Sequence, residues 1–129
     1  DATCYDALLH PDNPNHVLIG LGGPAKETSE ILKSTDSGQS WETVLSGNII
    51  RTFTHSTDNP KIVYASGRHA DGTLFFAASQ NFGDSWQTVE MPDSPAGVQV
   101  NDMVSVMEDG QEVLYLGTNN GVFSYRFEE

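Results

Sequence analysis

Two carboxylates and one guanidinium occupy matching places in three segments of this sequence. Asp6, Arg51 and Asp102 each stand eleven residues before an aligned apolar residue of their own segment; the aligned residues are Val17, Ile62 and Val113. Two carboxylates beside a guanidinium can bind a sugar, and such a pair of carboxylates can supply the acid and the base or nucleophile that cleave a glycosidic bond. We therefore predict a ligand-binding set of Asp6, Arg51 and Asp102, with the two aspartates as candidate catalytic residues.

A structural role for the same three residues is the alternative. The three charged side chains would then form salt bridges and water contacts along the strands that carry them, without binding a ligand. The shared register also depends on an alignment that a gap of one residue would break. Neither a metal site nor a cofactor is predicted.

A tryptophan-containing motif occurs twice, at a spacing of 45 residues. Its shared positions are Ser34, Asp36, Gly38 and Trp41 in residues 34–41, and Ser79, Asn81, Gly83 and Trp86 in residues 79–86. An Asp or Asn side chain can accept hydrogen bonds from nearby backbone N–H groups in a tight turn. The glycine supplies a positive φ, and the tryptophan is expected to bury its ring from the outer strand. The motif therefore predicts a structural turn, and the amide of Asn81 argues against a ligand-binding carboxylate at this position.

The rest of each repeat reads as short strands separated by turn formers. The expected strands are 4–10, 17–21, 30–34 and 40–45, then 49–55, 62–66, 73–79 and 85–90, then 101–107, 112–117 and 122–127. Four antiparallel strands in a unit of about 45 residues are typical of a propeller blade. The predicted fold is all-β, with blades at 1–48, 49–96 and 97–129, the last one lacking its outer strand.

With these two motifs and an Asp-Asn-Pro turn at 12–14 and again at 58–60, the chain resembles the Asp-box (BNR) repeat β-propellers. That family includes sialidases, xyloglucan-degrading glycosidases, sortilin-type receptors and photosystem II assembly factors. The resemblance covers almost the whole chain and implies the propeller fold, but only a shortlist of activities. A sialidase would need several converging arginines and a nucleophilic tyrosine, whereas the only arginines are Arg51, Arg68 and Arg126. Sialidase activity of this chain is therefore not expected.

Three blades cannot close a ring, because propellers have about four to eight. We expect the chain to be the C-terminal part of a larger propeller, or else to assemble with itself, for instance as two chains in a six-bladed ring. The expected partners are the remaining blades or a second copy, with a glycan or a protein as ligand.

The charge of the chain limits its partners further. Eighteen acidic and six basic residues give a formal net charge of −12, which repels phosphate backbones, so no nucleic-acid partner is expected. No apolar run approaches the roughly 18 to 20 residues of a membrane span, so no membrane insertion is expected. Cys4 is the single cysteine and cannot form a disulfide within the chain. An extracellular or periplasmic location is expected.

Two functions fit the sequence. The first is a non-catalytic propeller segment that binds a protein or a glycan as a scaffold module. The second is a fragment of a glycoside hydrolase whose channel is lined by carboxylates. Of these two functions, the sequence favours the non-catalytic one for this chain alone.

Overall fold

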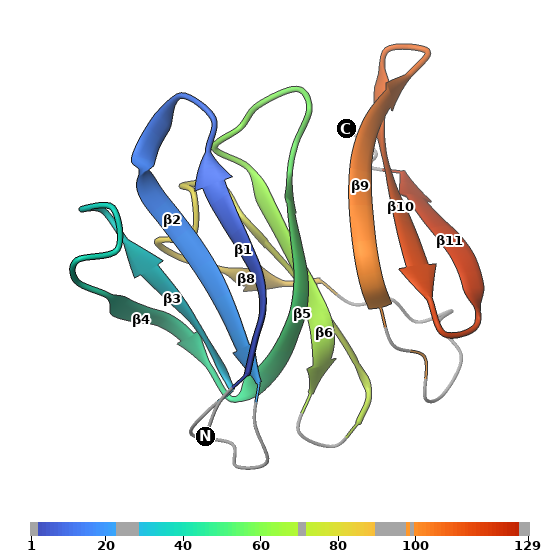
Figure 1. The fold of residues 1–129 in the computed structure, drawn as a ribbon. Helices are drawn as coiled ribbons and strands as arrows, with labels where there is room; N and C mark the ends of the chain where they lie inside the picture. Colours follow the sequence, from blue (N-terminus) through green and yellow to red (C-terminus); the bar gives the residue numbers. More distant parts are fainter. Residues whose placement is uncertain (1–2, 23–28, 70–71, 90–97, 99, 127–129) are drawn as a thin grey trace.

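Three antiparallel sheets stand side by side in the computed structural model (Figure 1). The structure describes residues 3–22, 29–69, 72–89, 98 and 100–126. Within each sheet, every strand pairs with the next strand along the chain, so each sheet is a meander. The described part of the chain contains no helix that is long and apolar enough to cross a membrane. The predicted all-β fold of propeller blades is confirmed.

We name the three sheets blade 1, blade 2 and blade 3. Blade 1 consists of β1 (Thr3–His10), β2 (Asn13–Gly22), β3 (Glu30–Ser34) and β4 (Glu42–Ser46). Blade 2 consists of β5 (Asn48–His55), β6 (Val63–His69), β7 (Leu74–Ser79) and β8 (Gln87–Thr88). Blade 3 consists of β9 (Val100–Glu108), β10 (Gln111–Thr118) and β11 (Gly121–Arg126), so within the described residues it has three strands.

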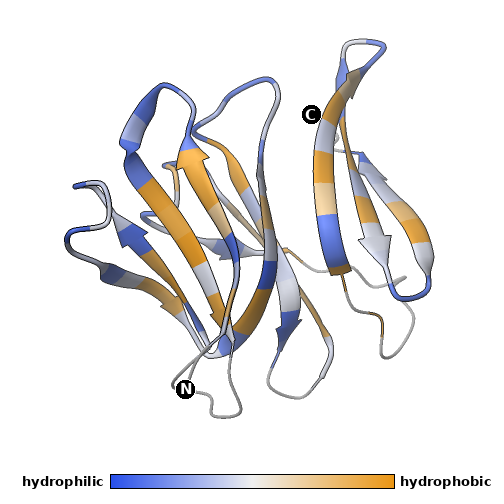
Figure 2. Cartoon of the chain, viewed as in Figure 1, coloured by the Kyte–Doolittle hydropathy of each residue, from blue (hydrophilic) through white to orange (hydrophobic). Residues whose placement is uncertain are grey.

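The strands follow from alternating side chains and from tight turns. In β9, Met103 and Ser105 are buried while Val104 is exposed, the two-residue period of a strand. Figure 2 shows hydrophobic residues along the strands and hydrophilic residues at the hairpin ends. The turn from β9 to β10 has φ values of 53° at Asp109 and 79° at Gly110, which suits a two-residue hairpin.

One hydrophobic core lies between blades 1 and 2. Its buried members are Leu18, Ile31, Ile50, Phe53, Val63, Ala65, Phe75, Ala77 and Phe82. The two blades approach closely at Gly20, because a Cβ there would lie 2.6 Å from Cγ2 of Ile50. This contact fixes β5 directly against β2.

A second core lies between blades 2 and 3. Its buried members are Tyr64, Phe76, Val100, Met103, Leu114 and Leu116. The rings of Tyr64 and Phe76 are stacked with their centroids 6.1 Å apart. The Tyr64 hydroxyl donates a hydrogen bond of 3.0 Å to Glu112 of blade 3. Blade 2 is therefore covered on both faces, whereas blades 1 and 3 each pack against one described neighbour.

Candidate functional site

The candidate residues lie on β1, β5 and β9, the first strand of each blade. Each of these strands contains a β-bulge, with one extra residue relative to its partner strand; the extra residues are Tyr5, Arg51 and Asn101. Bulges redirect side chains and occur often beside functional sites. The bulges therefore decide which side chains of the three blades share a register.

The structure corrects the register that the sequence predicted for Arg51. Directly after the bulges, Asp6 pairs with Gly20, Thr52 with Ser66, and Asp102 with Gly117. Thr52, and not Arg51, is therefore the blade 2 residue equivalent to Asp6 and Asp102. The alignment failed because it used Ile62 as the anchor, whereas Val63 pairs with Ser79 as Val17 pairs with Ser34.

The Asp6 carboxylate joins blade 1 to blade 2. Oδ1 accepts a 2.9 Å hydrogen bond from the backbone N–H of Ala7, and Oδ2 accepts a 2.8 Å bond from the backbone N–H of Phe53. Hydrogen bonds to an ionised carboxylate are stronger than neutral ones. Asp6 therefore satisfies a backbone donor of the following blade.

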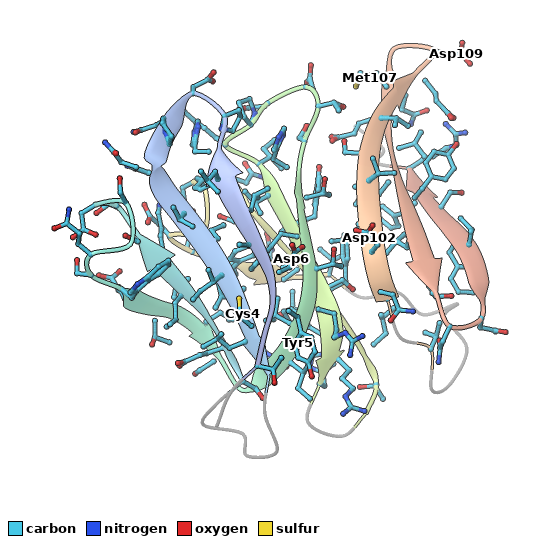
Figure 3. All side chains as sticks on the ribbon, viewed as in Figure 1. Cys4, Tyr5, Asp6, Asp102, Met107 and Asp109 are labelled. Carbon is cyan, nitrogen blue, oxygen red and sulfur yellow. The ribbon has the colours of Figure 1, made fainter. Side chains whose placement is uncertain are left out.

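Asp102 lies on β9, on the other side of β5 from Asp6 (Figure 3). Its Oδ1 accepts hydrogen bonds from the backbone N–H of Met103 at 2.9 Å and from the Thr52 hydroxyl at 3.3 Å. Both aspartates thus take part in the contacts between blades. Their predicted roles in catalysis or ligand binding stay predictions.

Arg51 stacks on a residue that the sequence reasoning missed. Its guanidinium carbon lies 4.5 Å from the centroid of the Tyr5 ring, a cation–π contact between blades 1 and 2. The Tyr5 ring rests against Gly22, where a Cβ would lie 2.7 Å from the ring, and 42% of Tyr5 stays exposed. Among the described residues Arg51 forms no ion pair. Only the bulges place Tyr5 and Arg51 at equivalent positions, so no sequence signal marked the pair.

The two Asp-box turns bond in nearly the same way. Ser34 Oγ donates to Asp36 Oδ1 at 2.8 Å and accepts from the Gly38 N–H at 2.8 Å; Ser79 does the same with Asn81 at 2.8 Å and Gly83 at 2.7 Å. Oδ1 of Asp36 also accepts the Ser40 N–H at 2.8 Å, and Oδ1 of Asn81 accepts the Ser85 N–H at 3.0 Å. The bond between the two side chains, Ser40 with Asp36 and Ser85 with Asn81, has opposite directions in the two boxes. Ser40 Oγ donates to Asp36 at 2.5 Å, whereas Asn81 Nδ2 donates to Ser85 at 2.9 Å. These side chains fold back on their own turns.

The two tryptophans differ from the expectation that both bury their rings on outer strands. Both precede the outer strands, since β4 begins at Glu42 and β8 at Gln87. Trp86 packs against the core between blades 1 and 2, and its indole N–H donates to the Gly83 carbonyl at 3.0 Å. Trp41 is 39% exposed, because it occupies the same place on the face of blade 1 that has no described neighbour.

Phe82 stands in the second box where Ser37 stands in the first, and it forms a contact between blades. Phe82 is 3% exposed, its ring lies 4.6 Å from the His10 ring, and the Lys33 ammonium lies 5.6 Å from its centroid. Lys33, which is buried, also forms a 2.7 Å ion pair with Asp84 of the same box. The second box therefore stabilises the contact between blades as well as its own hairpin.

We predict that the two boxes respond differently to acid. The hydrogen bond from the Ser40 hydroxyl, followed by further bonds from Ser40 and Ser34, lowers the pKa of Asp36 from 3.8 to about 2. A lowered pKa means that the ionised carboxylate stabilises the fold above pH 3.8, and that this contribution is lost as the pH falls through about 2. The substitution Asp36→Asn should therefore reduce the change in thermal midpoint between pH 5 and pH 2.

The second box provides the matched control. Asn81→Asp should add an acid-dependent loss of stability that the wild-type box lacks. Melting curves followed by circular dichroism at several pH values measure both effects. A difference between wild type and Asp36→Asn that does not vary with pH would contradict the prediction.

Comparison with solved structures places the fold among known propellers. An ancestral GH74 enzyme matches 94% of this chain over 17% of its own length, with 24% identity and a TM-score of 0.71. A point mutant of the NanB sialidase of Streptococcus pneumoniae matches 89% of this chain over 19% of its length, with 13% identity and a TM-score of 0.62. YCF48 from Cyanidioschyzon merolae matches 97% of this chain over 37% of its length, with 13% identity and a TM-score of 0.58.

No protein-family model and no curated protein matches the chain. The chain spans well under half of each of these three structures, and the identities are low enough that the likeness concerns the fold. The two Asp-box turns, the meander sheets and these matches agree with one another. The chain thus has the blade fold of the Asp-box (BNR) β-propellers.

Proposed function

We propose that this chain is a non-catalytic segment of an Asp-box propeller and serves as a module that binds a protein or a glycan. The observation that carries the proposal is the bonding of the two candidate aspartates. Asp6 accepts two backbone N–H groups, and Asp102 accepts a backbone N–H and the Thr52 hydroxyl. An acid or base in glycoside hydrolysis must exchange a proton with the substrate or with water, and the bonds to both oxygens of Asp6 compete with that exchange.

A fragment of a glycoside hydrolase is the second candidate. Asp6 and Asp102 share a register on β1 and β9, and an enzyme of the GH74 class and a sialidase have similar folds. On this hypothesis the two carboxylates line the channel of a complete ring and act on a sugar together with residues from other blades. Paired carboxylates across a glycosidic bond are the usual arrangement for this chemistry.

The proposed ligand-binding set remains Asp6, Arg51 and Asp102, to which the structure adds Tyr5 as a neighbour. An exposed aromatic ring can pack against the apolar face of a sugar, and the guanidinium can donate hydrogen bonds to its hydroxyl or carboxylate oxygens. The stacking of Arg51 on Tyr5 limits the freedom of both side chains before a ligand arrives. This preorganisation lowers the entropic cost of binding.

We expect the chain to bind an oligosaccharide without cleaving it. Titration calorimetry with a xyloglucan oligosaccharide and with sialyllactose measures binding, and a reducing-sugar assay measures cleavage. Arg51→Ala should weaken the binding of whichever sugar is bound by about tenfold, since it removes a charged hydrogen-bond donor. Arg126→Ala is the matched control, because Arg126 pairs with Glu108 on the exposed side of blade 3.

Cleavage that disappears in Asp6→Asn or Asp102→Asn would overturn the non-catalytic proposal and favour the hydrolase fragment. Failure to bind either sugar would reject these glycans and leave a protein as the ligand to be sought.

Blades 1 and 3 each have one sheet face without a described neighbour, which we call the open face. We also propose that these open faces pack against other propeller blades, either the remaining blades of a larger propeller or a second copy of the chain. Leu9 on the open face of blade 1 is 54% exposed, and Val104 and Val122 on that of blade 3 are 51% and 71% exposed. Apolar sheet faces of this kind favour association. The extracellular or periplasmic location stays a prediction.

A further inference from the structure

The contact between blades 1 and 2 includes a polar link at the register that follows the bulge. Asp6 uses Oδ1 for the N–H of its own next residue, Ala7, and Oδ2 for the N–H of Phe53 in the following blade. Phe53 follows Thr52, which occupies the Asp6 register in blade 2. Because Thr52 has no carboxylate, the Phe53 N–H is free to bond to the preceding blade.

Asp102 repeats the first half of this arrangement in blade 3. Its Oδ1 accepts the N–H of its own next residue, Met103, at 2.9 Å, the same distance as in blade 1. Its Oδ2 has no hydrogen-bond partner among the described residues, and Asp102 is exposed whereas Asp6 is half-buried. The strand alternation places Asp102 on the same face as Val104, opposite to Met103 and the core shared with blade 2. Oδ2 of Asp102 thus lies on the open face of blade 3, as Oδ2 of Asp6 lies on the face covered by blade 2.

The register alternates between carboxylate and hydroxyl across the described blades. Asp6 of blade 1 is followed by Thr52 of blade 2, and Thr52 donates its hydroxyl to Asp102 of blade 3. Each contact between blades therefore has one carboxylate at this register. Two facing carboxylates would repel each other unless one of them took up a proton.

We propose that the open face of blade 3 binds a further propeller blade that carries Thr or Ser at this register and donates its next backbone N–H to Oδ2 of Asp102. The proposal rests on the proposed packing of open faces against other blades and specifies which blade fits. Val104 and Val122 supply the apolar part of the surface, and Asp102 supplies the polar link.

A second copy of the chain does not meet this requirement. Among the described blades, the face of a second copy that could pack on blade 3 as blade 3 packs on blade 2 belongs to blade 1. Blade 1 carries Asp6 at the register, and the Ala7 N–H is already bonded to Asp6. Docking that face onto blade 3 would set two carboxylates against each other and leave Oδ2 of Asp102 without a donor. The structure therefore favours a blade of different sequence over self-assembly.

Sedimentation velocity of the wild-type chain and two variants tests the proposal. The wild-type chain should remain a monomer over the micromolar range at neutral pH. The Asp102→Thr variant should associate with itself at least about tenfold more tightly than the wild-type chain does. The new hydroxyl would face Asp6 of a second copy as Thr52 faces Asp102. Asp102→Ala is the matched control, since it removes the charge without supplying a donor, and it should associate less tightly than Asp102→Thr.

Adding Leu9→Asp or Val122→Asp to the Asp102→Thr variant tests which sheet faces form the contact between two copies. Each should abolish association, because the two residues lie on the two different faces that would meet. Wild-type association as tight as that of Asp102→Thr, or Asp102→Thr no tighter than Asp102→Ala, would overturn the proposal. Association that neither added substitution reduces would instead reject the packing of open faces. Sugar binding and cleavage are measured separately, so the ligand proposal can fail or stand independently.

Discussion

Gly67→Ala is expected to lower the free energy of unfolding by about 3 to 5 kcal/mol, among the largest effects of a single substitution. A Cβ on Gly67 would lie 1.8 Å from the carbonyl oxygen of Ile49 and 2.9 Å from its carbonyl carbon. These are backbone atoms, which cannot rotate away as the end of a side chain can. The strand pair β5–β6 would have to separate at the bulge that positions Arg51.

The control for this prediction is Gly117→Ala in β10. A Cβ there would lie 3.8 Å from the Asp102 carbonyl oxygen, its nearest neighbour among the described residues, which is an ordinary contact. Its unfolding free energy should change by less than about 1 kcal/mol. Urea denaturation followed by tryptophan fluorescence measures both variants. Equal losses in the two would contradict a role for the close approach at the bulge.

Phe82→Ser is expected to lower the free energy of unfolding by about 3 to 5 kcal/mol, the usual range for truncating a buried phenylalanine. The ring is 3% exposed and fills the space between His10 and the buried Lys33 ammonium. The substitution gives the second box the residue type that the first box has at Ser37. It keeps the hairpin but removes the contact between blades.

Ser37→Ala tests whether the box or the packing causes the loss. Ser37 has a φ of 62° and Phe82 a φ of 48°, so both residues stand at the same left-handed position of the turn. Ser37 is exposed, and its hydroxyl donates one hydrogen bond of 2.7 Å to Asn15, so its replacement should cost less than about 1 kcal/mol. A Phe82→Ser loss as small as that of Ser37→Ala, in the same urea titration, would show that the ring does not stabilise the contact between blades.

Local turn chemistry is the part of this protein that its sequence predicts well. The bonds of Ser34 and Asp36 involve residues at most four positions apart, so the motif itself contains the partners of these two side chains. The strands also follow closely, because alternation of apolar residues and turn formers are local signals. Most predicted strands lie within a few residues of the observed ones, whereas the strand expected at 85–90 is described only at Gln87–Thr88. Glu90 lies outside the described residues.

The register of the candidate residues could not be predicted with the same success, because it depends on the pairing between strands. One extra residue at each bulge shifts every later side chain by one position, and a count along the sequence cannot locate such a shift. For this reason a count along the sequence assigns Arg51 to the register of Asp6 and Asp102, although Thr52 is their equivalent. For the same reason no pattern in the sequence marks Tyr5 as the stacking partner of Arg51.

By itself, the sequence determined three repeated all-β units and the two turns that mark them, since these depend on contacts within a few residues. Only the tertiary structure decided how those units meet. In the tertiary structure Phe82 is buried in a contact between blades, and Trp41 is exposed whereas Trp86 packs against the core. The Asp6 carboxylate accepts a hydrogen bond from the next blade. The physical reason is that contacts between blades join residues about 45 positions apart, such as Asp6 and Phe53, and their partners are fixed by the bulges and by packing rather than by local preference.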